Sequence, residues 1–134
     1  SEPETQWLID EIERFQPDVI VSVHAPLGVL DFDGPPPPPP QLGILQLDRL
    51  GAYPGSLGNY AGRTLGIPVL TPELHYAGIM PTQDEIRGMW VDLIDWLDTH
   101  IGDRPLPLAP RPILPDWRDL LAPPEALLLR PAAT

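Results

Sequence analysis

The sequence contains no cysteine, so neither a disulfide framework nor thiolate chemistry is available to it. Positive charge is also scarce. Eight lysine and arginine residues stand against 19 acidic residues and give a formal net charge of −11. A chain of this charge is repelled by phosphate backbones and anionic lipids, which argues against nucleic acid or an anionic membrane as the main partner.

Long apolar runs are missing as well. No stretch of about 18 apolar residues is present that would cross a bilayer, and the first residues lack the pattern of a signal peptide. Together with the absence of cysteine, these features lead us to expect a cytoplasmic protein without a membrane partner. The chain opens on Ser1 rather than on methionine, which suggests a piece of a longer protein.

Proline, in contrast, is abundant, and most of the 21 prolines stand in two regions. Residues 35–40 are all proline and predict a stiff polyproline II segment. We interpret this segment as a surface loop insertion rather than as a docking site for a proline-binding domain. Beyond residue 102, prolines recur and no hydrophobic period remains. We therefore expect one domain over residues 1–102 and a proline-rich, largely irregular tail over residues 103–134.

Within the domain, the spacing of apolar residues predicts alternating helices and strands. The near-continuous apolar run at residues 18–24 predicts a strand covered on both faces. Further strands are predicted at residues 29–32 and 67–70. Helices are predicted at residues 2–16, 42–50, 57–65 and 82–101. This alternation predicts an α/β fold with a mixed, mostly parallel sheet and flanking helices.

Two of the predicted helices begin with the pattern of a capping box. Ser1 is followed three places later by Glu4, and Thr82 by Glu85. The last helix also carries a wide apolar stripe, which predicts that one of its faces belongs to the core. The stripe consists of Ile86, Met89, Trp90, Leu93, Ile94 and Leu97.

Two polar residues stand at the ends of predicted strands. His24 ends the first strand, and Glu73 follows the strand at residues 67–70. Ligands and catalytic groups gather at the carboxyl ends of strands in open α/β sheets. His24 by itself fits a structural residue as well as it fits a ligand or a base. Glu73 fits either a functional carboxylate or a salt bridge to an arginine such as Arg63 or Arg87.

Three further residues give weaker signals. His100 lies at a helix C-terminus, where a cation favoured by the helix dipole explains it. His75 forms a Glu-x-His pair with Glu73, but two ligands from one strand are a weak indication of metal. Ser22 precedes His24 on the same strand. The Gly-x-Ser-x-Gly motif is absent, so the sequence does not indicate a Ser-His-Asp triad.

Several motifs, taken in order, resemble the zinc carboxypeptidase family of the M14 type. They are Ser1-Glu2-Pro3-Glu4-Thr5, Ser22-Val23-His24, Tyr53-Pro54-Gly55-Ser56 and Thr71-Pro72-Glu73-Leu74. The second resembles the family's Ser-x-His element, the third falls at its mobile tyrosine loop, and the fourth resembles its Thr-x-Glu-Leu strand end. The resemblance runs to about His100 and is strongest to the bacterial murein peptide amidases within that family.

The resemblance implies the C-terminal half of a catalytic domain with a zinc cofactor. It implies that His24 is a zinc ligand and that Glu73 is the general base that activates the zinc-bound water. It also implies that Tyr53 closes over the substrate, a murein peptide cleaved between γ-D-glutamate and meso-diaminopimelate.

The family's other two zinc ligands come from an upstream His-x-x-Glu, which this sequence lacks. Its oxyanion arginine and its Asn-Arg carboxylate clamp also belong upstream. We therefore expect that the chain alone binds zinc weakly and does not turn over substrate. We also expect an exposed sheet edge, completed by a missing N-terminal half or a partner chain.

Two other functions remain open from the sequence. The first is a zinc deacylase acting on N-acyl amino acids, which would share His24 and Glu73 but lack the Tyr53 loop. The second is a non-catalytic binding module, in which residues 35–40 dock a partner and His24 is structural.

Overall fold

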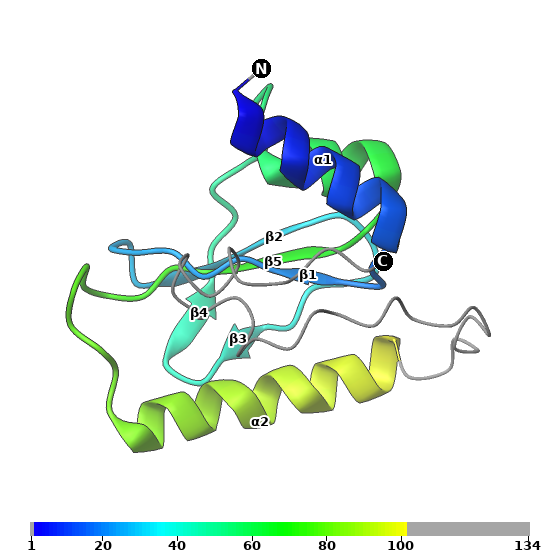
Figure 1. Ribbon diagram of the computed structural model, residues 1–134. Helices are drawn as coiled ribbons and strands as arrows, with labels where there is room; N and C mark the ends of the chain where they lie inside the picture. The colour runs from blue at the N-terminus through cyan, green and yellow to red at the C-terminus, as the bar shows by residue number, and fades with distance from the viewer. Residues whose placement is uncertain (1, 102–134) are drawn as a thin grey trace, which may run out of the picture. The chain divides into compact units, whose positions relative to one another are not determined.

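The computed structural model describes residues 2–101, which form helices on both sides of a five-stranded mixed sheet (Figure 1). The elements in chain order are α1 (Pro3–Phe15), β1 (Ile20–Val21), β2 (Val29–Asp33), β3 (Gln41–Leu42), β4 (Leu45–Leu47), η1 (Gly58–Leu65), β5 (Val69–Pro72) and α2 (Gln83–His100). Helices α1 and η1 lie on one side of the sheet and α2 on the other. The predicted α/β fold with a mixed sheet is confirmed, whereas the predicted tail, residues 103–134, lies outside the described residues.

The strand order in the sheet is β1-β5-β2-β4-β3. Strand β5 pairs in parallel with β1 and antiparallel with β2, and β4 pairs in parallel with β2 and antiparallel with β3. Parallel and antiparallel pairings are thus equally frequent among the described strands, where a mostly parallel sheet was expected. No helix within residues 2–101 has the length and apolar character needed to span a membrane.

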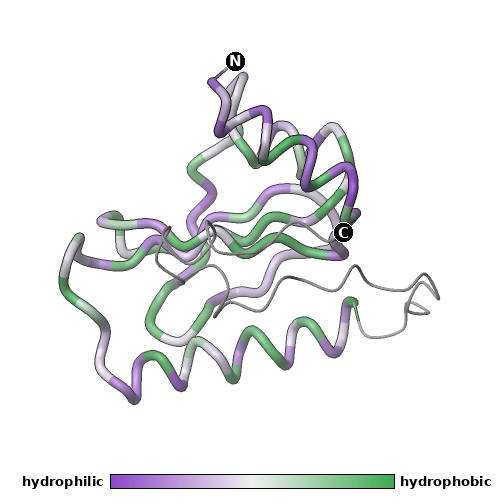
Figure 2. Tube along the Cα trace, viewed as in Figure 1, coloured by the Kyte–Doolittle hydropathy of each residue, from purple (hydrophilic) through white to green (hydrophobic). Residues whose placement is uncertain are grey.

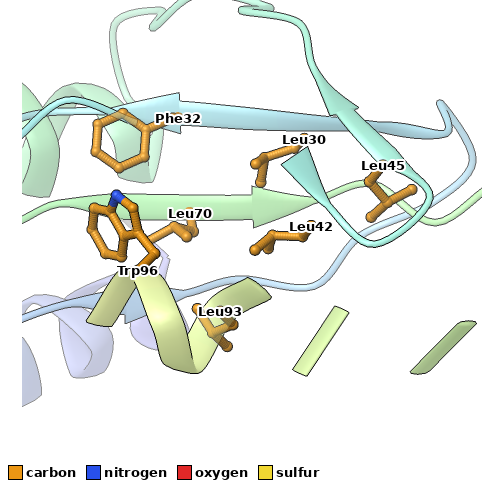
Figure 3. Close-up of a cluster of buried hydrophobic side chains, with 7 residues drawn as sticks. All are labelled: Leu30, Phe32, Leu42, Leu45, Leu70, Leu93 and Trp96. Carbon is orange, nitrogen blue, oxygen red and sulfur yellow. The ribbon is translucent and has the colours of Figure 1, made fainter. Parts of the chain in front are cut away.

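The core lies between the sheet and α2 (Figure 3). Its buried side chains are Leu30, Phe32, Leu42, Leu45, Leu70, Leu93 and Trp96. The rings of Phe32 and Trp96 meet edge to face with centroids 5.7 Å apart, an arrangement that aromatic quadrupoles favour. The sheet face and one face of α2 are therefore held together mainly by apolar burial.

The helix predicted at residues 42–50 is wrong, because a hairpin of β3 and β4 occupies this segment. Leu42 and Leu45 are both buried, and their spacing of three residues resembled a helical period. Gly43 turns the chain between them with φ of 57°, and its N–H donates to the carboxylate of Asp92 at 2.7 Å. The turn and this bond to α2 favour a hairpin over a helix. Neither feature produces a periodic pattern of apolar residues in the sequence.

The first helix begins at Pro3, one residue later than predicted. Its N-cap is Glu2, which makes no side-chain capping bond, and Pro3 occupies the first turn. Ser1, and with it the predicted capping box, lies outside the described residues; Pro3, whose missing N–H costs nothing at this position, opens the helix. The hydroxyl of Tyr60 donates to Glu13 at 2.9 Å and links η1 to α1.

The helix predicted at residues 57–65 is present as a π-helix, η1, and ends at Gly66 as expected. Two of its glycines allow it to approach strand β2 closely. A Cβ on Gly58 or Gly62 would lie within 3 Å of atoms of Asp33. These glycines therefore serve close packing of the helix on the sheet.

The polyproline segment is part of the packing rather than a plain surface insertion. Pro39 is buried, and the carbonyl of Pro37 accepts a 3.0 Å hydrogen bond from the indole nitrogen of Trp96. The segment includes a cis peptide bond between Pro35 and Pro36. Its contact with α2 explains how an indole in the core satisfies its polar N–H.

The capping box of Thr82 and Glu85 is confirmed at the start of α2. The apolar stripe of this helix is only partly core. Leu93 is buried, but Trp90 and Ile94 are 58% and 53% exposed. Figure 2 shows apolar and polar residues interleaved along α2. The stripe is wider than the sheet that covers it, because β1 is the last strand on that side.

Candidate functional site

The structure brings His24 and Glu73 together at the ends of two neighbouring strands. The two residues form a parallel bridge just beyond β1 and β5. The N–H of His24 donates to the carbonyl of Pro72 at 2.9 Å, and the N–H of Leu74 donates to the carbonyl of His24 at 2.8 Å. Because β1 and β5 are parallel, their carboxyl ends meet at one edge, as the sequence predicted.

The two side chains face each other across this bridge. Nδ1 of His24 lies 3.5 Å from Oε1 of Glu73, and the two side chains are 55% and 9% exposed. The other ring nitrogen, Nε2, lies 3.1 Å from the hydroxyl oxygen of Ser22. The site is thus a half-exposed imidazole set against a buried carboxylate.

Glu73 differs from the other buried carboxylate of the described residues. Asp31 accepts hydrogen bonds from the backbone N–H groups of Phe32 at 2.9 Å and Leu50 at 3.1 Å. Oε2 of Glu73, in contrast, is buried without a hydrogen-bond partner in the described part of the chain. An unsatisfied buried polar atom costs about 1–3 kcal/mol, so the fold retains this carboxylate at some expense of stability.

The alternative of a salt bridge from Glu73 to Arg63 or Arg87 is not formed among the described residues. Arg63 lies 3.5 Å from Asp33 instead, and within residues 2–101 the ion pair of Glu73 is the one with His24. The burial of Glu73 is therefore not compensated by a permanent cation from the described part of the chain.

The other two histidines do not join this site. The ring of His75 packs against Gly28, where a Cβ would lie 2.8 Å from the ring. Gly28 adopts φ of 72° after the cis bond of Ala25 and Pro26. His100 stacks on Trp96, and its Nδ1 lies 2.9 Å from the carbonyl oxygen of that residue. The predicted Glu-x-His pair is therefore not assembled, because the strand ends before His75.

Tyr53 lies on an exposed loop and contacts that loop rather than the site. Its side chain is 67% exposed, and its hydroxyl donates to the carbonyl of Leu50 at 3.3 Å. The loop turns at Gly51 and Gly55, with φ of 90° and 88°. The structure thus shows the predicted loop, with the Tyr53 side chain bonded to its own segment.

The described residues fit part of a zinc site. Zinc sites of hydrolases use three protein ligands and an open position. No group of three or more His, Cys, Asp or Glu side chains within residues 2–101 is arranged to hold a metal ion. His24 supplies one imidazole. The carboxylate oxygen of Glu73 that has no partner in these residues is free to accept a proton or to lie beside a bound cation. Further ligands would have to come from outside these residues.

Strand β1 presents an open backbone edge beside the site. The N–H groups of Ile20, Ser22 and His24 all donate to carbonyls of the β5 segment, each at 2.9 Å. Since alternate residues of a strand point their backbone groups to opposite sides, those of Val21 and Val23 face away from β5. No strand pairs with this side among the described residues.

An apolar groove of about 310 Å³ lies between this edge and α2. It is lined by Val21 and Val23 from the edge, by Leu74 and Met80 from the loop after β5, and by Trp90 of α2, among others. Val23 is 61% exposed. The prediction that the strand at residues 18–24 is covered on both faces is therefore wrong, because no element within residues 2–101 covers the side chains of Val21 and Val23.

Ser22 is the site residue to which the sequence gave no role of its own. Residues two apart in an extended strand point to the same face, so the Ser22-Val23-His24 spacing contained the signal. The absence of a nucleophile motif around Ser22 gave no indication of this contact. Only the fold shows that its hydroxyl meets the histidine ring.

No family model matches this chain, and no curated protein or solved structure matches it. The candidate site is therefore supported by its own geometry and by the motifs in the sequence.

Proposed function

We propose that this chain carries part of the active site of a zinc-dependent metallocarboxypeptidase or amidase that hydrolyses murein peptides between γ-D-glutamate and diaminopimelate. One observation supports this proposal most directly. The imidazole of His24 lies 3.5 Å from a buried carboxylate, Glu73, one of whose oxygens has no hydrogen-bond partner in the described residues. The resemblance of the surrounding motifs supplies the substrate class.

Each residue has a distinct role in this proposal. His24 holds the metal through a ring nitrogen. When bound, zinc would polarise the scissile carbonyl and make water a better nucleophile at neutral pH. Glu73 receives and donates the proton, and its position at a strand end fixes its backbone through a 2.8 Å bond from its N–H to the carbonyl of Val29. A rigid backbone suits a proton carrier, which must stay within hydrogen-bond reach of both reacting groups.

The proposed hydrolysis balances with Glu73 as the only proton carrier. Water attacks the carbonyl carbon of the amide, and its proton passes to the Glu73 carboxylate. The carbon–nitrogen bond then breaks, and Glu73 gives the proton to the departing amine. The carboxylate is restored at the end of the cycle, so no other acid is needed.

The remaining ligands would come from a further polypeptide segment, in the same chain or in a partner. The open edge of β1 supports this part of the proposal, because it leads directly to His24 and presents, beside an apolar groove, backbone groups that no strand within residues 2–101 pairs with. A strand that pairs with this edge in parallel would end next to His24 and Glu73. Residues that follow such a strand would therefore lie beside the site and complete it.

Zinc binding by the purified 134-residue chain tests the role of His24. We expect weak binding, measured by equilibrium dialysis, that is lost in the His24→Ala variant. His100→Ala is the matched control, because a nitrogen of that ring lies at hydrogen-bond distance from the carbonyl oxygen of Trp96. This variant should leave zinc binding unchanged. Equal binding by wild type and His24→Ala would contradict the proposal.

Hydrolysis tests the role of Glu73 once a completing segment is supplied. We expect release of diaminopimelate from a γ-D-glutamyl-diaminopimelate peptide, and a loss of at least about 100-fold in Glu73→Gln, in the range typical of a lost general base. Cleavage of N-acyl amino acids in place of this peptide would support the deacylase instead. Tight zinc binding and full turnover by the isolated chain would contradict the incomplete site.

A further inference from the structure

Within the described residues, the side chain of His24 forms its hydrogen bond with the hydroxyl of Ser22. Oγ of Ser22 lies 3.1 Å from Nε2, within the range of a hydrogen bond. Nδ1 lies 3.5 Å from Oε1 of Glu73, which is longer than a typical N–H···O bond. Nε2 is therefore within hydrogen-bond distance of Ser22, whereas Nδ1 faces Glu73 at a longer, ion-pair distance.

Both partners in this contact have a fixed backbone. The N–H of Ser22 donates to the carbonyl of Leu70, and that of His24 donates to the carbonyl of Pro72, each at 2.9 Å. The His24 side chain itself is 55% exposed, so packing alone does not hold the ring. The hydroxyl of Ser22 is the polar group placed to hold it.

We propose that Ser22 is a positioning residue that sets the tautomer of His24. Nε2–H donates to Oγ of Ser22, and the lone pair of Nδ1 then points to the space beside Glu73. This inference rests on the proposed function, because a ligating histidine typically donates its other N–H to a neighbouring acceptor, which fixes the tautomer and the ring orientation. Ser22 acts through His24 and does not touch substrate.

The opposite direction of the same hydrogen bond would have a different meaning. If the Ser22 hydroxyl donated to Nε2, Nδ1 would carry the proton and face Glu73. Ser22, His24 and Glu73 would then form a nucleophile, base and carboxylate in line. The 3.5 Å between Nδ1 and Oε1 is an ion-pair distance that fits either direction, so the two directions are separated by measuring the tautomer.

The tautomer is measured directly by long-range proton–nitrogen NMR spectra of the ¹⁵N-labelled 134-residue chain, without metal and at a pH where His24 is neutral. We expect a protonated Nε2 and an unprotonated Nδ1 for His24 in the wild type. In Ser22→Ala the two tautomers should mix, and Ser22→Thr, which keeps a hydroxyl, should restore the wild-type spectrum. Ser56→Ala is the matched control, since its hydroxyl accepts from the backbone N–H groups of Tyr53 and Asn59.

Two results would overturn the inference. One is a wild-type His24 protonated at Nδ1, and the other is an unchanged His24 spectrum in a folded Ser22→Ala variant, with folding checked by the backbone amide spectrum. Labelling of Ser22 by a fluorophosphonate also counts against it. In that reaction the Ser22 oxygen bonds to phosphorus, fluoride leaves, and the proton passes to Nε2.

A zinc titration of the same samples separates this inference from the proposed function. We expect added Zn²⁺ to shift Nδ1 of His24, with an affinity about 10-fold lower in Ser22→Ala, the lower end of the range for lost second partners of metal ligands. If the tautomer is as expected but Zn²⁺ leaves both ring nitrogens unmoved, the proposed function fails while the orientation by Ser22 stands.

Discussion

His24 and Glu73, which are far apart in the sequence, lie side by side in a parallel bridge, with 3.5 Å between Nδ1 and Oε1. The bridge follows from the pairing of Ile20 with Val69 and Val21 with Leu70, which brings the ends of β1 and β5 to the same level. A shift of register by one residue would turn one of the two side chains to the other face. The pairing of these strands is therefore what creates the candidate site.

The two buried carboxylates should respond oppositely to removal. Glu73→Met replaces an acceptor that has an unpartnered oxygen, so the free energy of unfolding should rise by about 1–3 kcal/mol. Asp31→Ala deprives two backbone N–H groups of their acceptor and should lower it by a similar amount. Urea unfolding of the 134-residue chain measures both, and a loss of stability in Glu73→Met would show that its carboxylate is satisfied in solution.

The indole of Trp96 should stabilise the polyproline segment. Trp96→Phe removes the donor to the carbonyl of Pro37 and should cost about 1 kcal/mol, the usual net worth of a hydrogen bond. Trp90→Phe is the matched control, because this side chain is exposed and should change stability by less than about 0.5 kcal/mol. Equal effects in urea unfolding would contradict the structural role of residues 35–40.

Two helical glycines should differ in their tolerance of alanine. A Cβ at Gly62 of η1 would lie 2.7 Å from Cβ of Asp33, so Gly62→Ala should cost about 1–3 kcal/mol through overpacking. At Gly88 of α2 the closest atom would be 3.6 Å away, an ordinary contact. Gly88→Ala should therefore stabilise the helix by up to about 1 kcal/mol, and thermal unfolding distinguishes the two outcomes.

The capping box of α2 should weaken in acid. The hydrogen bond from the backbone N–H of Thr82, followed by that from its hydroxyl, lowers the pKa of Glu85 below its ordinary value of 4.5. A carboxyl whose pKa is lower in the folded state stabilises the fold above the unfolded pKa and loses this effect as pH falls through the folded pKa. The Tm difference between wild type and Glu85→Ala should thus be largest near neutral pH and shrink below pH 4.5. The lower limit of the measurement, pH 3, lies roughly one unit or more below the ordinary pKa of a carboxyl. A Tm difference that stays constant from neutral pH to this limit would contradict the ionised cap.

The open edge of β1 should promote association of the isolated chain. Charged side chains on an edge strand oppose pairing with another strand, so Val23→Lys should reduce self-association seen by sedimentation. Val91→Lys adds the same charge at an exposed position of α2 outside the groove lining and serves as the control. If both variants act alike, the change in net charge rather than the edge is responsible.

Much of the local structure followed from the sequence. The helix at residues 82–101 was predicted from a capping box and a helical period, which depend on neighbouring residues only. The hairpin at residues 41–47 was missed, because its buried leucines are three residues apart and its turn depends on a bond from Gly43 to Asp92 on a distant helix. Edge exposure at Val23 was missed for a related reason, since an apolar run does not reveal whether another strand covers it.

The sequence by itself determined which residues stand at the strand ends, because apolar runs and the prolines that interrupt them are local properties. It therefore identified His24 and Glu73 as candidates, but it left each of them between a structural and a chemical role. Only the tertiary structure decided that the two meet, that a buried oxygen of Glu73 has no partner within residues 2–101, and that the Ser22 hydroxyl lies 3.1 Å from the histidine ring. These features depend on strand pairing and register, which join residues distant in the sequence and leave no periodic signal within either strand.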